Sequence, residues 1–275
     1  MPTYKLLALD MDGTLLTSDK RISDRTSSAL RRAAEAGITI VLSTGRAAVE
    51  LLDYQPQLEG VVRYGTLLSG AVVWDFTEKR ALETQFLDPE SVRIVVAQGL
   101  AEDAMVQLFD RECAIMTRRD VARMPEIGQG VYQDLALRRG TFVDDIDTYA
   151  RTHDHGLCKV NLHHVSRASM GATQRALGYL PLQLATGESA SVEVTPPGVT
   201  KALGLKWLYT FLGINPEEAI VVGDGDNDLE AMGIAGLAVA MDNARPAVKA
   251  CAHTIVADND HDGIVDVIER WIEHT

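Results

Sequence analysis

The sequence predicts an α/β protein with a Rossmann-like parallel sheet core and an inserted α+β domain. Near both ends of the chain, short apolar runs alternate with helical segments, which is the rhythm of βαβ units in a parallel sheet. In the middle, strand-like runs follow one another without a helix between them, as strands joined by hairpins do. We therefore expect residues 1–83 and 188–275 to form the core and residues 84–187 to form the inserted domain.

The first segment predicts a strand, a helix and a second strand. Residues 4–9 form a short apolar run of the kind that a buried parallel strand shows. Ser23 is a suitable N-cap and Gly37 a suitable C-terminal residue, so a helix is expected over 24–36. A second buried strand is expected over 38–42.

The C-terminal third repeats this alternation. We expect helices over 201–212, 226–232, 245–250 and from 264 onward, and strands over 219–222, 237–240 and 253–256. The middle of the chain differs. There we expect helices from residue 89 and over 167–177, strands over 105–109, 113–117 and 157–162, and a hairpin of 182–185 with 190–194.

Composition and charge are those of an ordinary globular chain. Hydrophobic residues make up 46%, and the longest apolar runs, such as 38–42, are far shorter than a membrane span. The 26 Lys and Arg against 39 Asp and Glu give a net charge of −13 without a basic stripe, so we expect no nucleic-acid and no membrane partner. The N-terminus has no signal-peptide layout and the three cysteines lie far apart, so we expect a cytoplasmic protein.

Polar side chains follow three of the expected parallel strands at their carboxyl ends, where open parallel sheets bind their ligands. Asp10 and Asp12 follow the first strand, Thr44 the second and Asp224 a later one. Neighbouring carboxylates repel one another unless a cation intervenes, and all-oxygen ligands indicate Mg²⁺. Thr44 and Lys201 supply the donor and the positive charge that a phosphate needs. The set indicates acid chemistry, a metal and a phosphate site.

Four motifs resemble those of the haloacid dehalogenase-like hydrolase superfamily, specifically the Cof-type phosphatases with a type IIB cap. They are, in chain order, Asp10-Met-Asp-Gly-Thr-Leu15, Ser43-Thr-Gly-Arg46, Gly198-Val-Thr-Lys201 and Gly223-Asp-Gly-Asp-Asn-Asp228. The inserted domain at 84–187 resembles the mobile cap of that subfamily. One departure is Ser69, which stands where the family usually has Asn, so an Asn contact near the cap hinge is lost or replaced.

The resemblance implies roles for the two acids of the first motif. Asp10 would be the nucleophile that forms an aspartyl-phosphate. Asp12 would protonate the leaving alkoxide and then deprotonate the attacking water. The resemblance also implies that Asp10, the backbone carbonyl of Asp12 and Asp224 bind Mg²⁺.

The other motifs imply the phosphate site. Thr44, Gly45, Lys201 and Asn227 would hold the phosphoryl oxygens, and Asp228 would support the metal or Lys201 from behind. Asp226, in the same cluster, reads as a solvated loop residue.

A calcium-loop lookalike lies near the C-terminus. The spacing of an EF-hand loop occurs in Asp258, Asp260, Asp262, Gly263 and Glu269. The residues before it predict a strand instead of an entering helix, and there is no second copy. We therefore expect no calcium site, and we expect Asp262 to cap the last helix.

Together these features predict a Mg²⁺-dependent phosphatase of small phosphorylated metabolites, sugar phosphates or related compounds. A phosphomutase of the phosphomannomutase type stays open, and it would need a second phosphate site in the cap. Candidates are Arg118, Arg119, Arg123, Arg138 and Arg139, for which a solvated face is the simpler interpretation. A non-catalytic phospho-ligand-binding regulator would predict loss of Asp10 or Asp12, and both are present. The sequence determines neither the natural substrate nor the oligomeric state.

Overall fold

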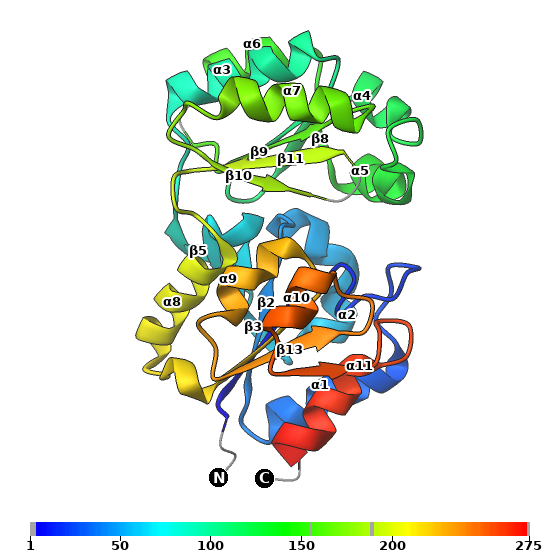
Figure 1. The fold of residues 1–275 in the computed structure, drawn as a ribbon, viewed down its shortest axis with the longest axis vertical. Helices are drawn as coiled ribbons and strands as arrows, with labels where there is room; N and C mark the ends of the chain where they lie inside the picture. Colours follow the sequence, from blue (N-terminus) through cyan, green and yellow to red (C-terminus); the bar gives the residue numbers. More distant parts are fainter. Residues whose placement is uncertain (1–3, 154–155, 188–189, 274–275) are drawn as a thin grey trace. The chain divides into compact units, whose positions relative to one another are not determined.

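The computed structural model describes residues 4–153, 156–187 and 190–273 (Figure 1). The chain forms two compact units. Unit 1 comprises Met1–Gly45, Asp53–Glu83 and Thr200–Thr275, and unit 2 comprises Arg46–Leu52 and Thr84–Val199.

Unit 1 is built on an eight-stranded sheet in the order β14-β13-β12-β1-β2-β3-β4-β5. Its strands are β1 (Leu6–Leu9), β2 (Thr39–Ser43), β3 (Val62–Leu67), β4 (Val72–Asp75), β5 (Arg80–Thr84), β12 (Ala219–Gly223), β13 (Leu237–Met241) and β14 (Thr254–Val256). Neighbouring strands from β14 to β3 are parallel, and β4 is antiparallel to β3. The predicted parallel sheet is confirmed, with an antiparallel edge that the sequence analysis did not include.

The helices of unit 1 form two groups. Helix α1 (Asp24–Glu35) packs against α11 (Gly263–Ile268), and α8 (Lys201–Leu212), α9 (Leu229–Met232) and α10 (Pro246–Cys251) form a second layer (Figure 1). Capping sets the helix ends. The Ser23 side chain accepts a bond from the Thr26 amide at 3.0 Å, as the sequence predicts, and Gly213 ends α8 with a φ of 65°.

The core of unit 1 is least exposed to solvent at the centre of the sheet. All four residues of β1 are 0% exposed, because helices cover both faces of a parallel sheet. Further short helical segments are η1 (Ala48–Tyr54), most of which belongs to unit 2, α2 (Gln55–Leu58), η2 (Leu68–Gly70), η4 (Pro216–Glu218), η5 (Asp226–Asp228) and η6 (Glu269–Glu273), which follows α11. In the part of the chain that the structure describes, no helix is long and apolar enough to cross a membrane.

Unit 2 contains a six-stranded sheet in the order β10-β11-β9-β6-β7-β8. Its strands are β6 (Met105–Phe109), β7 (Ala114–Thr117), β8 (Thr141–Val143), β9 (Lys159–His163), β10 (Gln183–Thr186) and β11 (Ser191–Thr195). Within the described part of unit 2, β7 and β8 form the only parallel pair, and the other strand pairs are antiparallel. The hairpin-rich α+β character expected for the inserted domain is therefore present.

Helices cover one face of this sheet. α3 (Pro89–Ala101), α6 (Ile146–Thr152) and α7 (Arg167–Leu177) lie over it (Figure 1), and their apolar side chains form one buried core with the even-numbered residues of β6, β9 and β11. Two further helices, α4 (Arg118–Arg123) and α5 (Gln133–Arg139), follow β7, with the short turn η3 (Gly130–Tyr132) between them.

Two differences from the sequence-based expectation concern strands. We expected the inserted domain to end at residue 187, but β10 and β11 pair with each other and β11 pairs with β9, so the six-stranded sheet extends to Thr195. Strands β3, β4, β5 and β8 were not predicted. Strand β3 carries an interior glycine, Gly65, where a Cβ would lie 2.8 Å from the Leu67 side chain, and a glycine weakens the strand pattern.

Candidate active site

The parallel register of unit 1 brings four sequence-predicted residues to one edge of the sheet. Leu9 lies opposite Val222 of β12 and Leu42 of β2, so the residues that follow these strands emerge side by side. Asp10, Thr44 and Asp224 lie just beyond the carboxyl ends of β1, β2 and β12. Lys201 begins α8. This is the edge at which open parallel sheets bind ligands.

Three carboxylates form a cluster at this edge. Asp10, Asp224 and Asp228 each place one carboxylate oxygen within 4.8 Å of the others. Asp10 is 7% exposed and Asp228 is 1% exposed, so their charges are poorly screened by water. Such a cluster of hard oxygen donors is suited to a small divalent cation.

Lys201 is the buried cation of the cluster. Its Nζ atom lies 2.8 Å from Oδ1 of Asp10 and 2.7 Å from Oδ1 of Asp228. Burial alone would lower the pKa of Lys201, but the two carboxylates outweigh it and hold the pKa above the ordinary value. The ammonium group therefore stays charged at neutral pH.

For the pKa of Asp10, in contrast, burial outweighs the effect of the neighbouring ammonium group. Burial raises the pKa of Asp10 well above its usual range, Lys201 opposes that shift, and the nearby Asp228 and Asp224 carboxylates add to it. One ammonium group thus faces three acids, and the cluster carries a net negative charge. A second cation is the natural complement of this site.

Asp228 is held by donors on both of its oxygens. Oδ1 accepts from Lys201, and Oδ2 accepts from the backbone amides of Asp224 and Gly225 at 3.1 and 3.0 Å. A Cβ at Gly223 would overlap the Asp228 carboxylate, so this close approach requires glycine there. The carboxylate is therefore fixed in place between α8 and the loop after β12.

Two residues without a predicted role support the first motif. The Thr14 hydroxyl donates to Oδ1 of Asp224 at 2.8 Å, and the Asn243 amide donates to the carbonyl of Gly13 at 2.7 Å. Gly13 has a φ of 79°, and a Cβ there would overlap the Asp224 carboxylate. Thr14 belongs to the first motif, so its position was a usable signal, whereas no role was predicted for the distant Asn243.

Asp12 lies in a more accessible position than Asp10. Its Oδ1 forms an ion pair with Nζ of Lys20 at 2.8 Å, and both side chains are about one-fifth exposed. Lys20 adopts a φ of 57°, and its carbonyl accepts from the Tyr54 hydroxyl at 3.1 Å. Sequence reasoning did not identify Lys20, because nothing in the pattern joins a loop lysine to an acid eight residues earlier.

The remaining predicted residues are fixed by backbone contacts. Thr44 is 1% exposed; its amide donates to the carbonyl of Thr66, and its carbonyl accepts from the amide of Ser69 at 3.0 Å. Gly45 follows Thr44 directly, and Asn227 lies in η5 between Asp226 and Asp228. Ser69, the departure from the family pattern, therefore joins the loop after β2 through its main chain.

Two further groups of acidic residues have ion-pair or hydrogen-bond partners away from the site. Asp226 is exposed and pairs with Arg245 at 2.6 Å, as expected of a solvated loop residue. In the calcium-loop lookalike, Asp260 accepts from the amide and hydroxyl of Ser18, and Asp262 accepts from the hydroxyls of Ser23 and Thr26.

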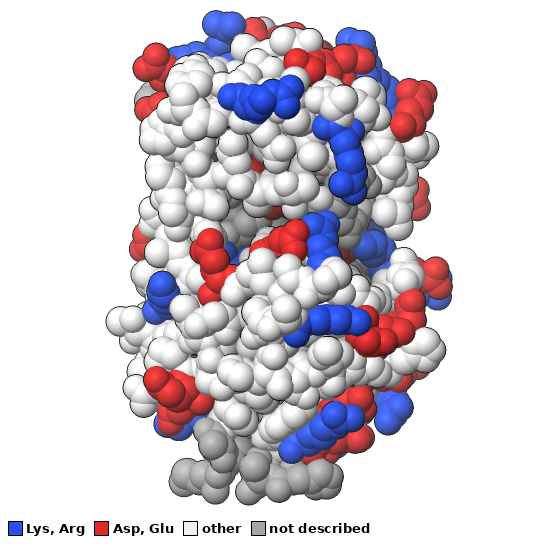
Figure 2. Space-filling view, viewed as in Figure 1, with Lys and Arg blue, Asp and Glu red and all other residues white. Residues whose placement is uncertain are grey.

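Asp262 is the N-cap residue of the last helix, α11, as expected, but its side chain does not take part in the cap. Asp262 has a φ of 56° and makes no side-chain capping bond, because its carboxylate is engaged by the start of α1. The strand expected before the lookalike is confirmed as β14. The face in Figure 2 carries basic and acidic side chains interspersed.

Comparison with known proteins supports this geometry. Residues 7–268 match the family model described as haloacid dehalogenase-like hydrolase. The 5-amino-6-(5-phospho-D-ribitylamino)uracil phosphatase YbjI of Escherichia coli K12 is 26% identical, over 99% of this chain and 97% of that protein. A haloacid dehalogenase-like hydrolase from Bacteroides thetaiotaomicron has a crystal structure that covers 97% of this chain and 99% of its own, with 26% identity and a TM-score of 0.83.

One relative is much longer. The chloroplastic endoribonuclease YBEY of Arabidopsis thaliana is 28% identical over 98% of this chain, which spans only 47% of that protein. The chain thus matches about half of that relative and nearly all of the bacterial phosphatase.

Proposed function

The chain belongs to the haloacid dehalogenase-like hydrolase family and is a phosphoric monoester hydrolase of the Cof type, and within that class we propose that it is a Mg²⁺-dependent phosphatase of sugar phosphates and related small metabolites. The observation that carries the proposal is the cluster of Asp10, Asp224 and Asp228 around the charged Lys201. This arrangement combines an acid nucleophile, a metal site and a fixed cation for the phosphoryl group.

The residues present fit Mg²⁺. The cluster offers oxygen ligands alone, and the three carboxylates outnumber the single ammonium group of Lys201. Asp10, the carbonyl of Asp12 and Asp224 would hold the ion, while Asp228 is committed to Lys201 and two amides. When bound, Mg²⁺ supplies positive charge that offsets the charge of the transferring phosphoryl group.

Asp10 is the proposed nucleophile. Its carboxylate oxygen forms a bond to phosphorus while the bond from phosphorus to the alcohol oxygen breaks, which gives an aspartyl-phosphate and an alkoxide. Lys201 pairs with the Asp10 side chain and opposes the rise in the pKa of Asp10 that burial causes. Water then displaces Asp10 from phosphorus and releases inorganic phosphate.

Asp12 is the proposed general acid and base. It gives its proton to the leaving alkoxide in the first step and takes one from water in the second, so it ends the cycle protonated as it began. Its greater exposure suits a side chain that moves protons between substrate and water.

Thr44, Gly45, Lys201 and Asn227 are proposed to hold the phosphoryl oxygens. Thr44 is fixed by two backbone bonds to β3 and the turn after it, so the position of its side chain is preorganised. Asp228 is proposed to position Lys201. The inserted domain, whose six-stranded sheet extends to Thr195, is proposed to be the cap that selects the substrate.

The test is a screen of phosphorylated metabolites with Mg²⁺ and again with EDTA. Release of inorganic phosphate from small monoesters that requires Mg²⁺ supports the proposal. Turnover that is equal in EDTA would contradict the metal requirement.

A second measurement separates hydrolysis from mutase chemistry. The protein is incubated with hexose 1- and 6-phosphates, with and without a catalytic amount of the hexose bisphosphate, and both products are followed by ³¹P NMR. We expect phosphate release to dominate throughout. Interconversion of isomers that outpaces phosphate release would replace the phosphatase with a mutase.

A further inference from the structure

The loop between β14 and α11, which carries the calcium-loop spacing, binds the segment that follows the first motif. The side-chain amide of Asn259 donates to the carbonyl of Leu16 at 2.8 Å. The Asp260 carboxylate accepts from the Ser18 amide at 2.8 Å and from the Ser18 hydroxyl at 2.6 Å. Farther along the segment, Asp262 accepts from two hydroxyls at the start of α1. Two acids of this loop are therefore engaged in holding the segment in place.

Within this segment, Lys20 lies in a tight turn. The amide of Lys20 donates to the carbonyl of Thr17 at 2.8 Å, and the amide of Thr17 donates to the carbonyl of Arg21 at 2.9 Å. The hydroxyl of Tyr54, at the end of η1, donates to the carbonyl of Lys20 at 3.1 Å. These bonds fix both the amide and the carbonyl of Lys20.

The backbone of Lys20 is strained. Its φ of 57° lies in the left-handed region, which is unfavourable for a residue with a Cβ atom and is usually occupied by glycine or asparagine. A residue stays in such a conformation only when the surrounding contacts hold it there, and strained residues are concentrated at functional sites. The strain thus points to a function of the lysine side chain.

The side chain of Lys20 reaches the proposed general acid and base. Its Nζ atom lies 2.8 Å from Oδ1 of Asp12, and the two side chains are 19% and 20% exposed. Ion pairs that water reaches contribute little to stability, so stability alone does not account for the strained turn. The contact does restrict the orientation of the Asp12 carboxyl group, and an acid or base works only when it is held within reach of the atom that it serves.

We propose that Lys20 is a positioning residue for Asp12: its ammonium group binds Oδ1, so that Oδ2 carries the proton that the general acid donates. The proposal rests on the proposed function, in which Asp12 is the acid and base. Asp260 contributes by holding the turn that carries Lys20. All three residues belong to unit 1.

The assignment of the proton follows from the chemistry of the two groups. An ammonium group has three donors and no acceptor, so it binds a carboxyl oxygen that carries no proton. With Oδ1 of Asp12 bound to Lys20, the proton given to the leaving alkoxide comes from Oδ2, and the proton taken from water returns to Oδ2. Lys20 itself exchanges no proton and does not touch the phosphoryl group.

The experiment compares two aryl phosphates of similar shape. Phenyl phosphate has the poorer leaving group and needs the general acid more than p-nitrophenyl phosphate does. In Lys20→Met, the ratio of kcat/KM for phenyl phosphate to that for p-nitrophenyl phosphate should fall about tenfold, because a misplaced acid loses part of the 10²–10⁴-fold effect of general acid catalysis. Lys20→Arg keeps a cation with donors alone and should retain most of the ratio.

A double variant tests whether Lys20 acts through Asp12. Residues that act as a unit have non-additive effects, so Lys20→Met introduced into Asp12→Asn should cause no further fall in the ratio. Separate losses that multiply in the double variant would reject the proposal. A higher ratio in Lys20→Met than in the wild type would also reject it, because the ion pair would then restrain Asp12 instead of positioning it.

Lys79→Met is the matched control. Lys79 is exposed and also has a left-handed backbone, with a φ of 50°, in the turn between β4 and β5. Because β4 is antiparallel to β3, this turn lies at the opposite edge of the sheet from Asp10. We expect the wild-type ratio in Lys79→Met, and a fall equal to that in Lys20→Met would overturn the proposal.

Lys20→Gly separates positioning from folding. Glycine adopts a φ of 57° without strain, so the melting temperature should equal or exceed that of the wild type, while the ratio should fall as in Lys20→Met. A wild-type ratio in Lys20→Gly would overturn the proposal. The proposed function fails separately: equal losses on the two aryl phosphates in Asp12→Asn would reject the acid role itself, whereas a fall in the ratio confined to Asp12→Asn would reject only the role of Lys20.

Discussion

The Nζ atom of Lys201 lies 2.8 Å from Oδ1 of Asp10, and the two side chains are 0% and 9% exposed. This pair joins the first residue of α8 to the end of β1, two elements that lie far apart in the sequence. Because Asp228 shares the same ammonium group, removing Lys201 would leave buried acids facing one another.

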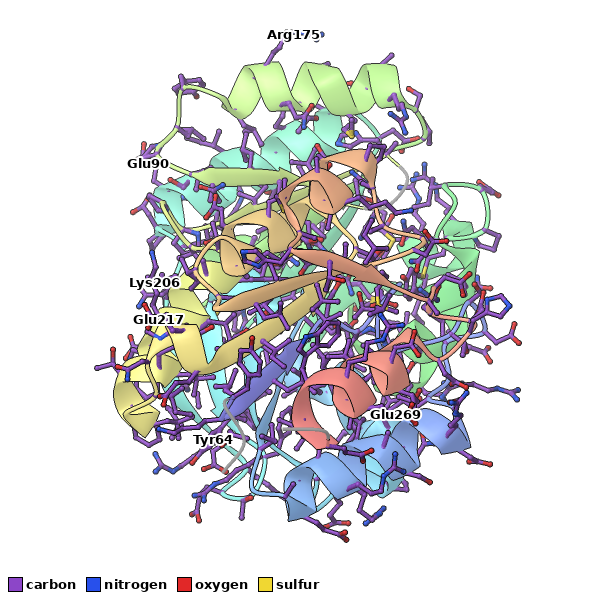
Figure 3. The ribbon with its side chains drawn as sticks, turned by 60° about the horizontal axis from the view of Figure 1, so that its bottom comes forward. Tyr64, Glu90, Arg175, Lys206, Glu217 and Glu269 are labelled. Carbon is purple, nitrogen blue, oxygen red and sulfur yellow. The ribbon has the colours of Figure 1, made fainter. Side chains whose placement is uncertain are left out.

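Lys201→Met should therefore impair both activity and stability. We expect kcat to fall at least ~100-fold, and the free energy of unfolding to fall by about 3–5 kcal/mol, since one partner of a buried pair is removed. Phosphate release and urea unfolding measure the two effects. Lys206→Met is the matched control, because Lys206 is exposed on the same helix (Figure 3). Similar losses in both variants would argue against a special role for Lys201.

Asp10→Asn should abolish turnover while the fold persists. The amide is nearly isosteric with the carboxylate but cannot act as the nucleophile. Phosphate release should fall to background, while thermal unfolding remains cooperative. Asp226→Asn is the control, because Asp226 is exposed and paired with Arg245 in the loop after β12. Phosphate release at the wild-type rate from Asp10→Asn would exclude it as the nucleophile.

The sequence predicts those parts of the fold that local patterns determine. The expected bounds of α8 and α7 match the structure, because α8 ends at Gly213 and the Ser166 side chain caps α7. Strands β3, β4 and β5 were missed although β3 and β4 pair as neighbours in sequence, because Gly65 interrupts the apolar pattern of β3. Ion pairs between residues far apart in sequence, such as Lys159 with Glu193, likewise could not be predicted from local patterns.

The candidate site also combines residues that local patterns predict with contacts that they do not. Motif residues such as Asp10 and Asp224 can be recognised because strand ends gather at one edge of a sheet. The contacts of Lys20 with Asp12 and of Asn243 with Gly13 depend on how loops fold back, and no periodicity encodes that.

Asp12→Asn should affect substrates unequally. A poor leaving group needs proton donation, whereas an activated aryl group leaves with little help, so the loss in kcat should be larger for alkyl than for aryl phosphates. We expect about 10²–10⁴-fold for alkyl phosphates, the range of general acid–base catalysis. Steady-state kinetics on p-nitrophenyl and alkyl phosphates gives the comparison. Equal losses on the two classes would count against the acid role.

His163 should make stability depend on pH in a defined window. Its folded-state pKa is about 4 against an ordinary value of 6.5, because burial disfavours the charged ring. As the pH falls below 6.5 the unfolded chain takes up the proton first, so stability present above pH 6.5 is lost progressively down to about pH 4. The loss is about 3 kcal/mol at the acid end.

Melting temperatures of the wild type and His163→Gln across this range test the prediction. The variant should lose less stability on acidification, whatever its stability at neutral pH. His153→Gln serves as the control, because His153 is exposed and should leave the wild-type slope in place. Parallel pH profiles for the wild type and His163→Gln would show that His163 is not the group responsible.

Glu269→Gln should leave the protein without any change in calcium response. An EF-hand loop needs Asp258, Asp260, Asp262 and Glu269 to turn their oxygens toward one ion. Here Asp260 and Asp262 accept bonds from Ser18, Ser23 and Thr26, and a strand, β14, enters the segment where a helix would be required. Glu269 begins the turn η6 after α11 (Figure 3). Calorimetry with Ca²⁺ should show the same weak or absent heat for wild type and variant, and Mg²⁺-dependent activity should be equal. A micromolar Ca²⁺ site that disappears in Glu269→Gln would show that these side chains rearrange around an ion.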